Sequence, residues 1–194
     1  VPEPTDTKTT LTSLLAALFD REGKVVSSWN ATQEELLRTP VVGAMPAAPG
    51  AYRLRIAAID SDGRAGTADY DVEAEIVQTG PLKVSSLILG LSRDGRFLPK
   101  LLFTTEPVAI AYVELYGAAP GTRISSALEI AKTMNGPALS AVPLAIESSA
   151  ENRYIAKGAI PIGALPPGDY IIRALVGIEG QALTRVVRTL RKAQ

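Results

Sequence analysis

The clearest pattern of apolar and polar positions in this chain is a strict alternation on both sides of one turn. The stretch 52–58 is apolar at every second position, and two of the three residues between are arginines. The stretch 68–76 repeats the alternation with acidic residues in the polar positions. Between them, Asp60-Ser61-Asp62-Gly63 is a turn sequence, in which glycine can adopt positive φ. Because successive side chains of a strand point to opposite faces, the pattern predicts a hairpin of two half-buried strands.

The charges of this hairpin suggest its register. Folding about the turn is expected to place Arg55 opposite Asp71 and Arg53 opposite Glu73, which pairs opposite charges across the strands. Each such pair contributes ~0.2–1 kcal/mol, so the pairs favour one register and do not hold the fold.

The entry into this hairpin returns near the other end of the chain. Pro49-Gly50-Ala51-Tyr52 matches Pro167-Gly168-Asp169-Tyr170, 118 residues later, and each copy continues into an apolar strand, an acid-Gly turn and a second strand. This spacing is about the size of a domain, so the repeat predicts two modules. Gly80-Pro81 is a breaker pair that follows the first hairpin. We therefore expect one domain at 1–79 and another at 81–194. The first is short for a sandwich, so we expect it to lack a strand that preceding residues would supply.

Short apolar segments separated by turn residues run through the whole chain. It contains 16 Gly and 14 Pro in 194 residues, and four acid-Gly pairs each separate two apolar stretches. This punctuation favours an all-β fold of β-sandwich type, and in the second module the expected strands include 83–89, 98–104 and 139–147. The segment 10–19 also fits one face of a helix, but the turn sequence at 20–23 favours a strand. One helical turn is expected at 32–37, where Thr32 and Glu35 have the spacing of a capping box.

The second hairpin differs from the first on its outer face. Opposite Tyr170 lie Ile171 and Leu175, where the first hairpin has Arg53 and Ala57. An outward apolar pair predicts cover by the other module, by a partner chain or by a preceding domain. Cover by longer loops of the same module fits equally well, because periodicity does not separate these cases. If the chain binds a protein or forms a homodimer, Ile171 and Leu175 are the expected contact residues.

Composition excludes several kinds of chemistry. The chain has no Cys and no His, which removes zinc sites with nitrogen or sulfur ligands, disulfides and triads that need imidazole. Lys plus Arg equals Asp plus Glu, at 20 each, without the basic excess of nucleic-acid-binding proteins. No apolar run reaches the roughly 18–20 residues that span a bilayer. No motif gives the remaining carboxylates catalytic roles, so we expect neither an enzyme nor a cofactor.

Two features are weak candidates for a binding site. Asp60 and Asp62 resemble part of a calcium loop, although the pattern of a full loop fails at its last ligand position, which favours a plain turn. Trp29 is the one tryptophan. An exposed indole would serve as a platform for a sugar ring, but large aromatic side chains more often fill the core of a sandwich.

The two hairpins also resemble a known family. The Pro-Gly-x-Tyr entry is similar to the start of strand F in immunoglobulin-like and fibronectin type III domains, where a tyrosine hydroxyl bonds back to the backbone. The stretches PGAYRLRIAAIDSDGRAGTADYDVEA and LPPGDYIIRALVGIEGQALTRVVRTLRK resemble the C-terminal tandem β-sandwich region of secreted bacterial von Willebrand factor A-related proteins. The resemblance implies two tandem immunoglobulin/fibronectin III-like sandwiches with Tyr52 and Tyr170 as corner tyrosines. It carries no metal site, because the Asp-x-Ser-x-Ser motif is absent.

These expectations combine into one functional hypothesis. The chain starts at Val1 in a polar, linker-like stretch without an initiator Met, which suggests a mature form or a fragment of a longer protein. We expect a non-catalytic, extracytoplasmic tandem that acts as a spacer or protein-interaction region of a larger secreted or surface protein. Its partner would be another protein or a preceding domain, with no nucleic acid and no membrane insertion. The alternative is a carbohydrate-binding accessory module of a polysaccharide-degrading protein.

Overall fold

The fold is all-β, as the turn pattern predicts. The computed structural model describes residues 9–119, 121–150 and 152–194, and these ranges contain strands and one short helix. The expected linker at the N-terminus lies outside the described residues. The chain divides into two compact units, Val1–Glu75 and Ile76–Gln194, which are called unit 1 and unit 2 below.

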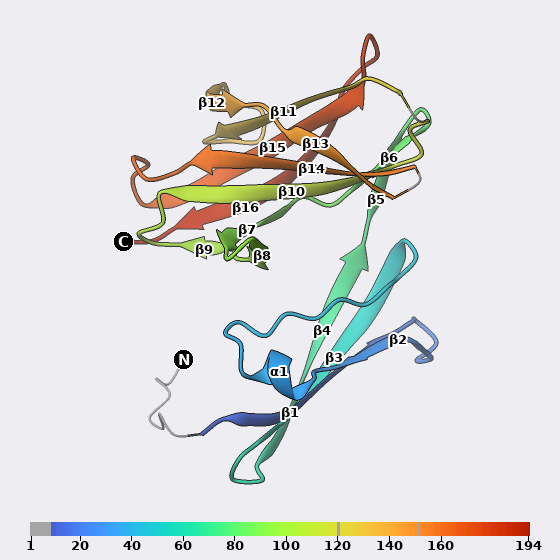
Figure 1. Ribbon diagram of the computed structural model, residues 1–194, viewed down its shortest axis with the longest axis vertical. Coiled ribbons are helices and arrows are strands. Elements are labelled where there is room, and N and C mark those ends of the chain that lie inside the picture. Colours follow the sequence, from blue (N-terminus) through green and yellow to red (C-terminus); the bar gives the residue numbers. More distant parts are fainter. Residues whose placement is uncertain (1–8, 120, 151) are drawn as a thin grey trace. The chain divides into compact units, whose positions relative to one another are not determined.

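Unit 1 is built on one antiparallel sheet with the strand order β2-β1-β3-β4 (Figure 1). The ambiguous segment is a strand, β1, and the expected helical turn is α1. Thr32 caps this helix: its Oγ1 accepts a hydrogen bond from Glu35 N at 3.3 Å, and its own N–H donates to Glu35 Oε2 at 2.7 Å. The capping box is therefore confirmed. The elements are β1 (Leu11–Phe19), β2 (Val25–Asn30), α1 (Gln33–Leu36), β3 (Gly50–Asp60) and β4 (Ala65–Ala74).

The β1–β2 hairpin and the β3–β4 hairpin both close through a five-residue turn with the sequence pattern Asp-x-acidic-Gly-basic. Asp20 Oδ1 accepts hydrogen bonds from two backbone N–H groups of its turn, at 3.0 and 2.8 Å. Asp60 Oδ1 accepts two in the same way, both at 2.9 Å. Each turn has its glycine at positive φ, +81° at Gly23 and +77° at Gly63. The aspartate thus satisfies backbone donors that would otherwise lack a partner in the loop.

This turn corrects the expected register of the β3–β4 hairpin. Because the loop runs from Asp60 to Arg64, Arg55 lies opposite Asp69 rather than Asp71, and Arg53 lies opposite Asp71 rather than Glu73. Arg55 donates two hydrogen bonds to Asp69, each at 2.8 Å. Opposite charges do face each other across the two strands, but each arginine lies opposite the acidic residue two positions earlier in β4 than expected.

Unit 1 has a small core. Its buried apolar side chains are Ala16, Ala17 and Leu18, while apolar residues such as Val25 and Tyr70 are exposed. The described residues of the unit supply a single sheet, so the second layer expected of a sandwich at 1–79 is not among them.

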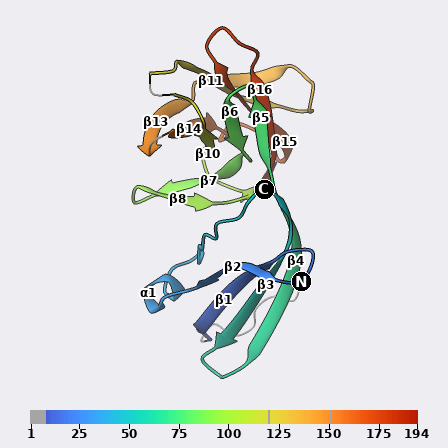
Figure 2. The ribbon, with the colours of Figure 1, turned by 90° about the vertical axis from the view of Figure 1, so that its right-hand side faces the viewer.

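Unit 2 contains two sheets (Figures 1 and 2). The first has the order β13-β14-β10-β6-β5, and the hairpin β7–β8 joins it through β10. The second has the order β12-β11-β15-β16-β9. All pairs are antiparallel except β16–β9. The strands are β5 (Ile76–Thr79), β6 (Leu82–Ser85), β7 (Ile88–Arg93), β8 (Arg96–Pro99), β9 (Leu102–Phe103), β10 (Val108–Tyr116), β11 (Ile124–Ala131), β12 (Ala138–Val142), β13 (Ala145–Ala150), β14 (Arg153–Pro161), β15 (Gly168–Ile178) and β16 (Thr184–Lys192).

The core of unit 2 lies between these sheets. Every second residue of β10 is buried, and the inner residues of β15 and β16 join the same apolar cluster. Tyr170 and Phe103 are the largest fully buried side chains of the cluster. Two sheets that share one interdigitated core form a sandwich.

The boundary between the units lies earlier than the sequence suggests. Gly80 and Pro81 form the two-residue turn of the β5–β6 hairpin, where Thr79 pairs with Leu82. Gly80 has φ +56°, which suits this turn. The breaker pair therefore ends a strand and not a domain, and the division falls after Glu75, the one residue between β4 and β5.

Three long strands expected in unit 2 are each interrupted. The stretch 83–89 breaks between β6 and β7, where Ser85 Oγ accepts a hydrogen bond from Glu114 N at 2.9 Å in place of a backbone carbonyl. The stretch 139–147 breaks between β12 and β13 next to Pro143, which cannot donate to a ladder. The stretch 98–104 divides into β8 and β9, which belong to different sheets.

The two tyrosines of the repeated motif make the hydrogen bond expected of a corner tyrosine. Tyr52 OH donates to Ala48 O at 2.8 Å, and Tyr170 OH donates to Pro166 O at 2.7 Å. Tyr170 is fully buried and Tyr52 is half-buried. The same local contact therefore lies in a full core in unit 2 and at a partly open face in unit 1.

Candidate functional site

The candidate site is a groove of about 510 Å³ on the outer face of the second sheet of unit 2. Ile171, one of the two expected contact residues, lies in it. Leu175 is half-buried on the same face but is not among the lining residues. The groove is lined by Leu101, Leu102, Met134, Ile171, Val187, Arg188, Thr189 and Arg191.

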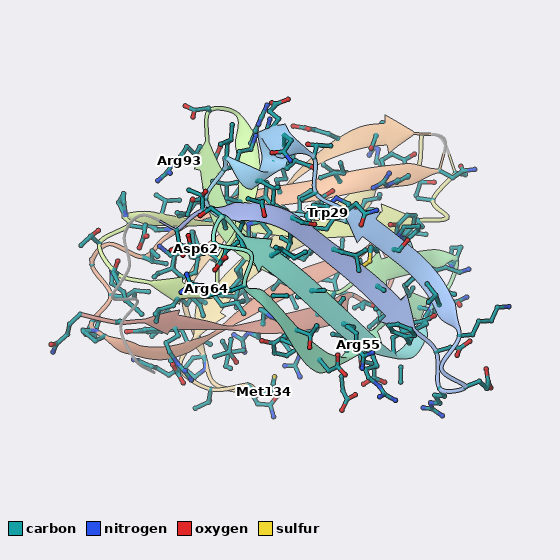
Figure 3. All side chains as sticks on the ribbon, turned by 90° about the horizontal axis from the view of Figure 1, so that it is seen from below. Trp29, Arg55, Asp62, Arg64, Arg93 and Met134 are labelled. Atoms are coloured by element: carbon teal, nitrogen blue, oxygen red, sulfur yellow. The ribbon has the colours of Figure 1, made fainter. Side chains whose placement is uncertain are left out.

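Three of the apolar lining residues are open to solvent. Leu101, Leu102 and Met134 are 51%, 48% and 44% exposed. Leu101 directly precedes β9, Leu102 is the first residue of β9, and Met134 lies in the β11–β12 loop, where Figure 3 shows it at the surface. The groove therefore combines an apolar floor on the sheet with apolar walls from two loops.

A buried arginine organises one wall of this groove. Arg173 lies on the outer face between Ile171 and Leu175 and is only 6% exposed. Its Nη2 lies 2.8 Å from Glu129 Oε2, and its Nη1 donates to Gly136 O at 2.8 Å and to the carbonyl of Met134 at 3.3 Å. The β11–β12 loop is thus held over the sheet, so the expected cover by the module's own loops is present in part.

Sequence reasoning missed Arg173. It matches Arg55 in the repeat, and Arg55 pairs with Asp69 at an exposed position. The only signal in the sequence was its place between two outward apolar residues, which indicates that something covers this part of the sheet.

An ion pair fixes the other wall. Lys100 Nζ lies against Glu106 Oε1, and Glu106 Oε2 accepts a hydrogen bond from Thr104 N at 2.6 Å. These contacts hold together the two ends of the segment 100–106, which contains Leu101 and Leu102 of the groove. The hydrogen bonds from Lys100 and Thr104 lower the pKa of Glu106 to about 2, against the opposing effect of burial.

This carboxylate gives the wall a defined pH dependence. Because the pKa of Glu106 is lowered in the folded state, its contribution to the free energy of unfolding is complete above about pH 4.5 and is lost as the pH falls toward 2. We expect the wild type to lose more thermal stability over this interval than Glu106→Gln, as measured by melting curves. Parallel losses in the two proteins would contradict this assignment.

Asp60 and Asp62, the two weak candidates for metal ligands, bind groups of their own turn instead. Besides its two backbone contacts, Asp60 binds Arg64 through Oδ2 at 2.7 Å, and Asp62 Oδ2 lies 3.1 Å from Arg64 Nη2. Figure 3 shows Asp62 and Arg64 at the same loop. In the part of the chain that the structure describes, no three His, Cys, Asp or Glu side chains are grouped to hold a metal ion.

Trp29 is half-buried on β2, and one segment of backbone lies against its ring. A methyl group built on Gly43 would come within 2.5 Å of Trp29 Cδ2. The backbone at Gly43 thus covers part of the indole, which reduces the ring surface open to a sugar.

We expect Gly43→Ala to displace this segment from the indole. The added methyl group has no space against the ring, so Trp29 gains solvent and unit 1 loses about 1–3 kcal/mol. Tryptophan emission should shift to the red. In the control Gly66→Ala, a new Cβ meets nothing within 4 Å, and the emission should stay in place. An unshifted spectrum for Gly43→Ala would show that the indole is not covered there.

A polar cluster lies on the outer face of the other sheet of unit 2. Glu114 accepts hydrogen bonds from Tyr112 OH at 2.8 Å, from Arg153 Nη2 at 2.7 Å and from Tyr116 OH. Burial alone would raise the pKa of Glu114, but the hydrogen bonds from Arg153 and the two tyrosines lower it. Burial and the contact with Glu114 raise the pKa of Tyr112 to about 12. The carboxylate thus stays ionised and the phenols neutral, which suits a structural network and not proton transfer near pH 7.

No family model matches the chain, and no curated protein matches it. Among solved structures, a DUF3823 family protein from Bacteroides ovatus ATCC 8483 aligns over 94% of this chain and 92% of its own, with 11% identity and a TM-score of 0.38. Within the described ranges, no helix has the length and hydrophobicity of a membrane span.

Proposed function

We propose that this chain is a non-catalytic protein-interaction region and that the groove beside β16 is its contact site. The observation that carries the proposal is the set of exposed apolar side chains at Leu101, Leu102 and Met134 around the half-buried Ile171. Exposed apolar residues gathered in one concave place are typical of a surface that binds another protein.

We further propose that unit 2 is an immunoglobulin/fibronectin III-like sandwich. The order β13-β14-β10-β6 corresponds to D-E-B-A in that fold, and β12-β11-β15-β16 corresponds to C′-C-F-G. The corner tyrosine at the start of β15 supports the assignment of β15 to strand F. In unit 1 the order β2-β1-β3-β4 corresponds to C′-C-F-G alone, so unit 1 would be one half of the same sandwich.

The setting of this interaction region is also a proposal. The resemblance of its hairpins to the C-terminal region of secreted von Willebrand factor A-related proteins supports an extracytoplasmic position within a larger secreted or surface protein. There the two units would act as a spacer that displays the groove to a partner.

Carbohydrate binding is the less favoured function. It would need an exposed aromatic platform, and Trp29 has the backbone of Gly43 against its ring. The hydroxyls of Tyr112 and Tyr116 already donate to Glu114. If tryptophan fluorescence responds to a glycan in a saturable way, the order of the two functions reverses.

The groove can be tested with a display library of extended peptides selected on the wild type. Ile171→Arg places a charge in the groove, and we expect it to weaken the recovered peptides at least about tenfold, which is about 1.4 kcal/mol. The matched control is Ile88→Arg, which changes an exposed isoleucine on the other sheet of unit 2. Peptides that bind Ile171→Arg as well as the wild type would contradict the proposed site.

A further inference from the structure

One edge of the second sheet of unit 2 is open along most of β16. On one side β16 pairs with β15 along its length, but on the other side β9 pairs with it only at Arg191 and Lys192. From Thr184 to Leu190, no strand of the described residues is hydrogen-bonded to that side of β16. Such an edge presents backbone N–H and C=O groups that another strand can pair with.

The groove follows this edge. Val187, Arg188 and Thr189 are consecutive residues of β16, and all three line it. Val187 and Thr189 lie on the outer face with Ile171, and Arg188 points to the opposite face, so the groove extends from the outer face over the edge of β16. An extended segment is therefore the shape that fits it.

The charge of β16 indicates what kind of segment would bind. The strand has the sequence TRVVRTLRK, with four cations and no acid. Arg191 is paired with Asp169, Arg185 bonds to the β11–β12 loop, and Lys192 is buried. Arg188 is exposed and forms no ion pair with any residue of the described ranges. An acidic strand would be attracted to this edge.

The chain itself contains such a strand. β4 has the sequence AGTADYDVEA, with Asp69, Asp71, Glu73 and no cation. It pairs with β3 on one side, and the structure's described part places no strand on its other side. Most of its residues are exposed, and Tyr70 offers an aromatic side chain that is 57% exposed.

We propose that β4 of one copy of this chain docks along the edge of β16 of another copy and extends the second sheet of unit 2. The proposal rests on the proposed function, because β4 would occupy part of the same groove. The contact is heterologous, so in a bound pair the copy that supplies β4 keeps its β16 free, and the copy that supplies β16 keeps its β4 free. The product is a head-to-tail chain or ring of copies and not a two-fold dimer. Opposite charges on the two edges make the association sensitive to salt.

Sedimentation velocity of the whole chain tests this directly. At about 0.01 M salt, where the screening length is about 30 Å, the average mass should rise with concentration beyond that of a dimer. At about 1 M salt, where the screening length is about 3 Å, the association should weaken at least about tenfold. A wild type that stays monomeric over the whole concentration range at low salt overturns the proposal.

Charge reversal on each edge separates this contact from other kinds of association. The variant Arg188→Glu/Thr189→Glu reverses the β16 edge, and Asp71→Lys/Glu73→Lys reverses the β4 edge. All four residues are exposed. Each variant alone should remain monomeric at concentrations where the wild type associates. A 1:1 mixture should associate again, because every junction between the two variants joins opposite charges. The matched control is Arg93→Glu in the β7–β8 hairpin, which should behave as the wild type.

Folded variants whose mixture stays monomeric would overturn the pairing of β4 with β16. This failure is distinct from failure of the proposed function. If the wild type is monomeric but selected peptides still require Ile171, the groove remains a protein-binding site with a different partner. If the copies associate and peptides ignore Ile171, the edge contact stands without the groove.

Discussion

Replacing Arg173 by alanine is expected to destabilise unit 2 by about 3–5 kcal/mol, because the change leaves polar groups without a partner in a covered site. Glu129 would lose its ion pair, and the carbonyls of Met134 and Gly136 would lose a donor. Removal of one member of a buried pair costs far more than the pair itself contributes, since the other charge stays behind.

The chain contains its own control for this experiment. Arg55 occupies the matching position in the repeat, but its side chain is 49% exposed and pairs with Asp69 in solvent. We expect Arg55→Ala to cost less than about 1 kcal/mol. Urea unfolding of the two variants, followed by circular dichroism, measures both costs. Equal losses would show that the cover over Arg173 does not exclude water.

Phe103→Ala is expected to cost about 3–5 kcal/mol, because it removes a fully buried aromatic side chain from the core of unit 2. Phe103 belongs to β9, a strand of two residues that joins the second sheet through its parallel pair with β16. Loss of the side chain leaves a cavity and also loosens this short strand.

Its neighbour is the matched control. Leu102 shares the same strand but points to the groove and is 48% exposed. Leu102→Ala should change the free energy of unfolding by no more than about 0.5 kcal/mol. Chemical denaturation of both variants decides the matter. Similar costs for Leu102 and Phe103 would mean that β9 does not separate core from groove as described.

The sequence predicted what local pattern determines. The alternation in 52–58 and 68–76 identified β3 and β4, because period two is a property of the strand itself. The repeated Pro-Gly-x-Tyr motif located two equivalent strands, because the tyrosine bonds to a carbonyl only four residues away. The spacing of Thr32 and Glu35 located a helix for the same reason.

The errors arose where distant residues or loop geometry decide. The register of the β3–β4 hairpin is set by the Asp60 side chain inside the turn, which charge pairing across the strands did not reveal. The break between β8 and β9 depends on which sheet each segment joins, and the break between β6 and β7 depends on the Ser85 side chain, which takes the place of a backbone partner for Glu114 N. Periodicity predicted one residue of the groove, Ile171. It could not predict Met134 and Leu101, because their positions depend on contacts with residues distant in the sequence or in a loop: Arg173 binds the carbonyl of Met134, and the Lys100–Glu106 ion pair holds the segment that contains Leu101.

The short parallel pair of β9 with β16 has a consequence for folding during synthesis. Phe103 takes its place beside Lys192, so the core of unit 2 cannot close until the ribosome has released the last strand of the sandwich. The pairings of unit 1 span shorter stretches, the widest joining Leu11 to Asp60, and both of its hairpins carry self-capped turns. Loop closure over fewer residues has a smaller entropic cost. We therefore expect unit 1 to fold while unit 2 is still being synthesised. The apolar strands of unit 2 stay exposed during this interval, so the nascent second unit is the part of the chain that would most need a chaperone.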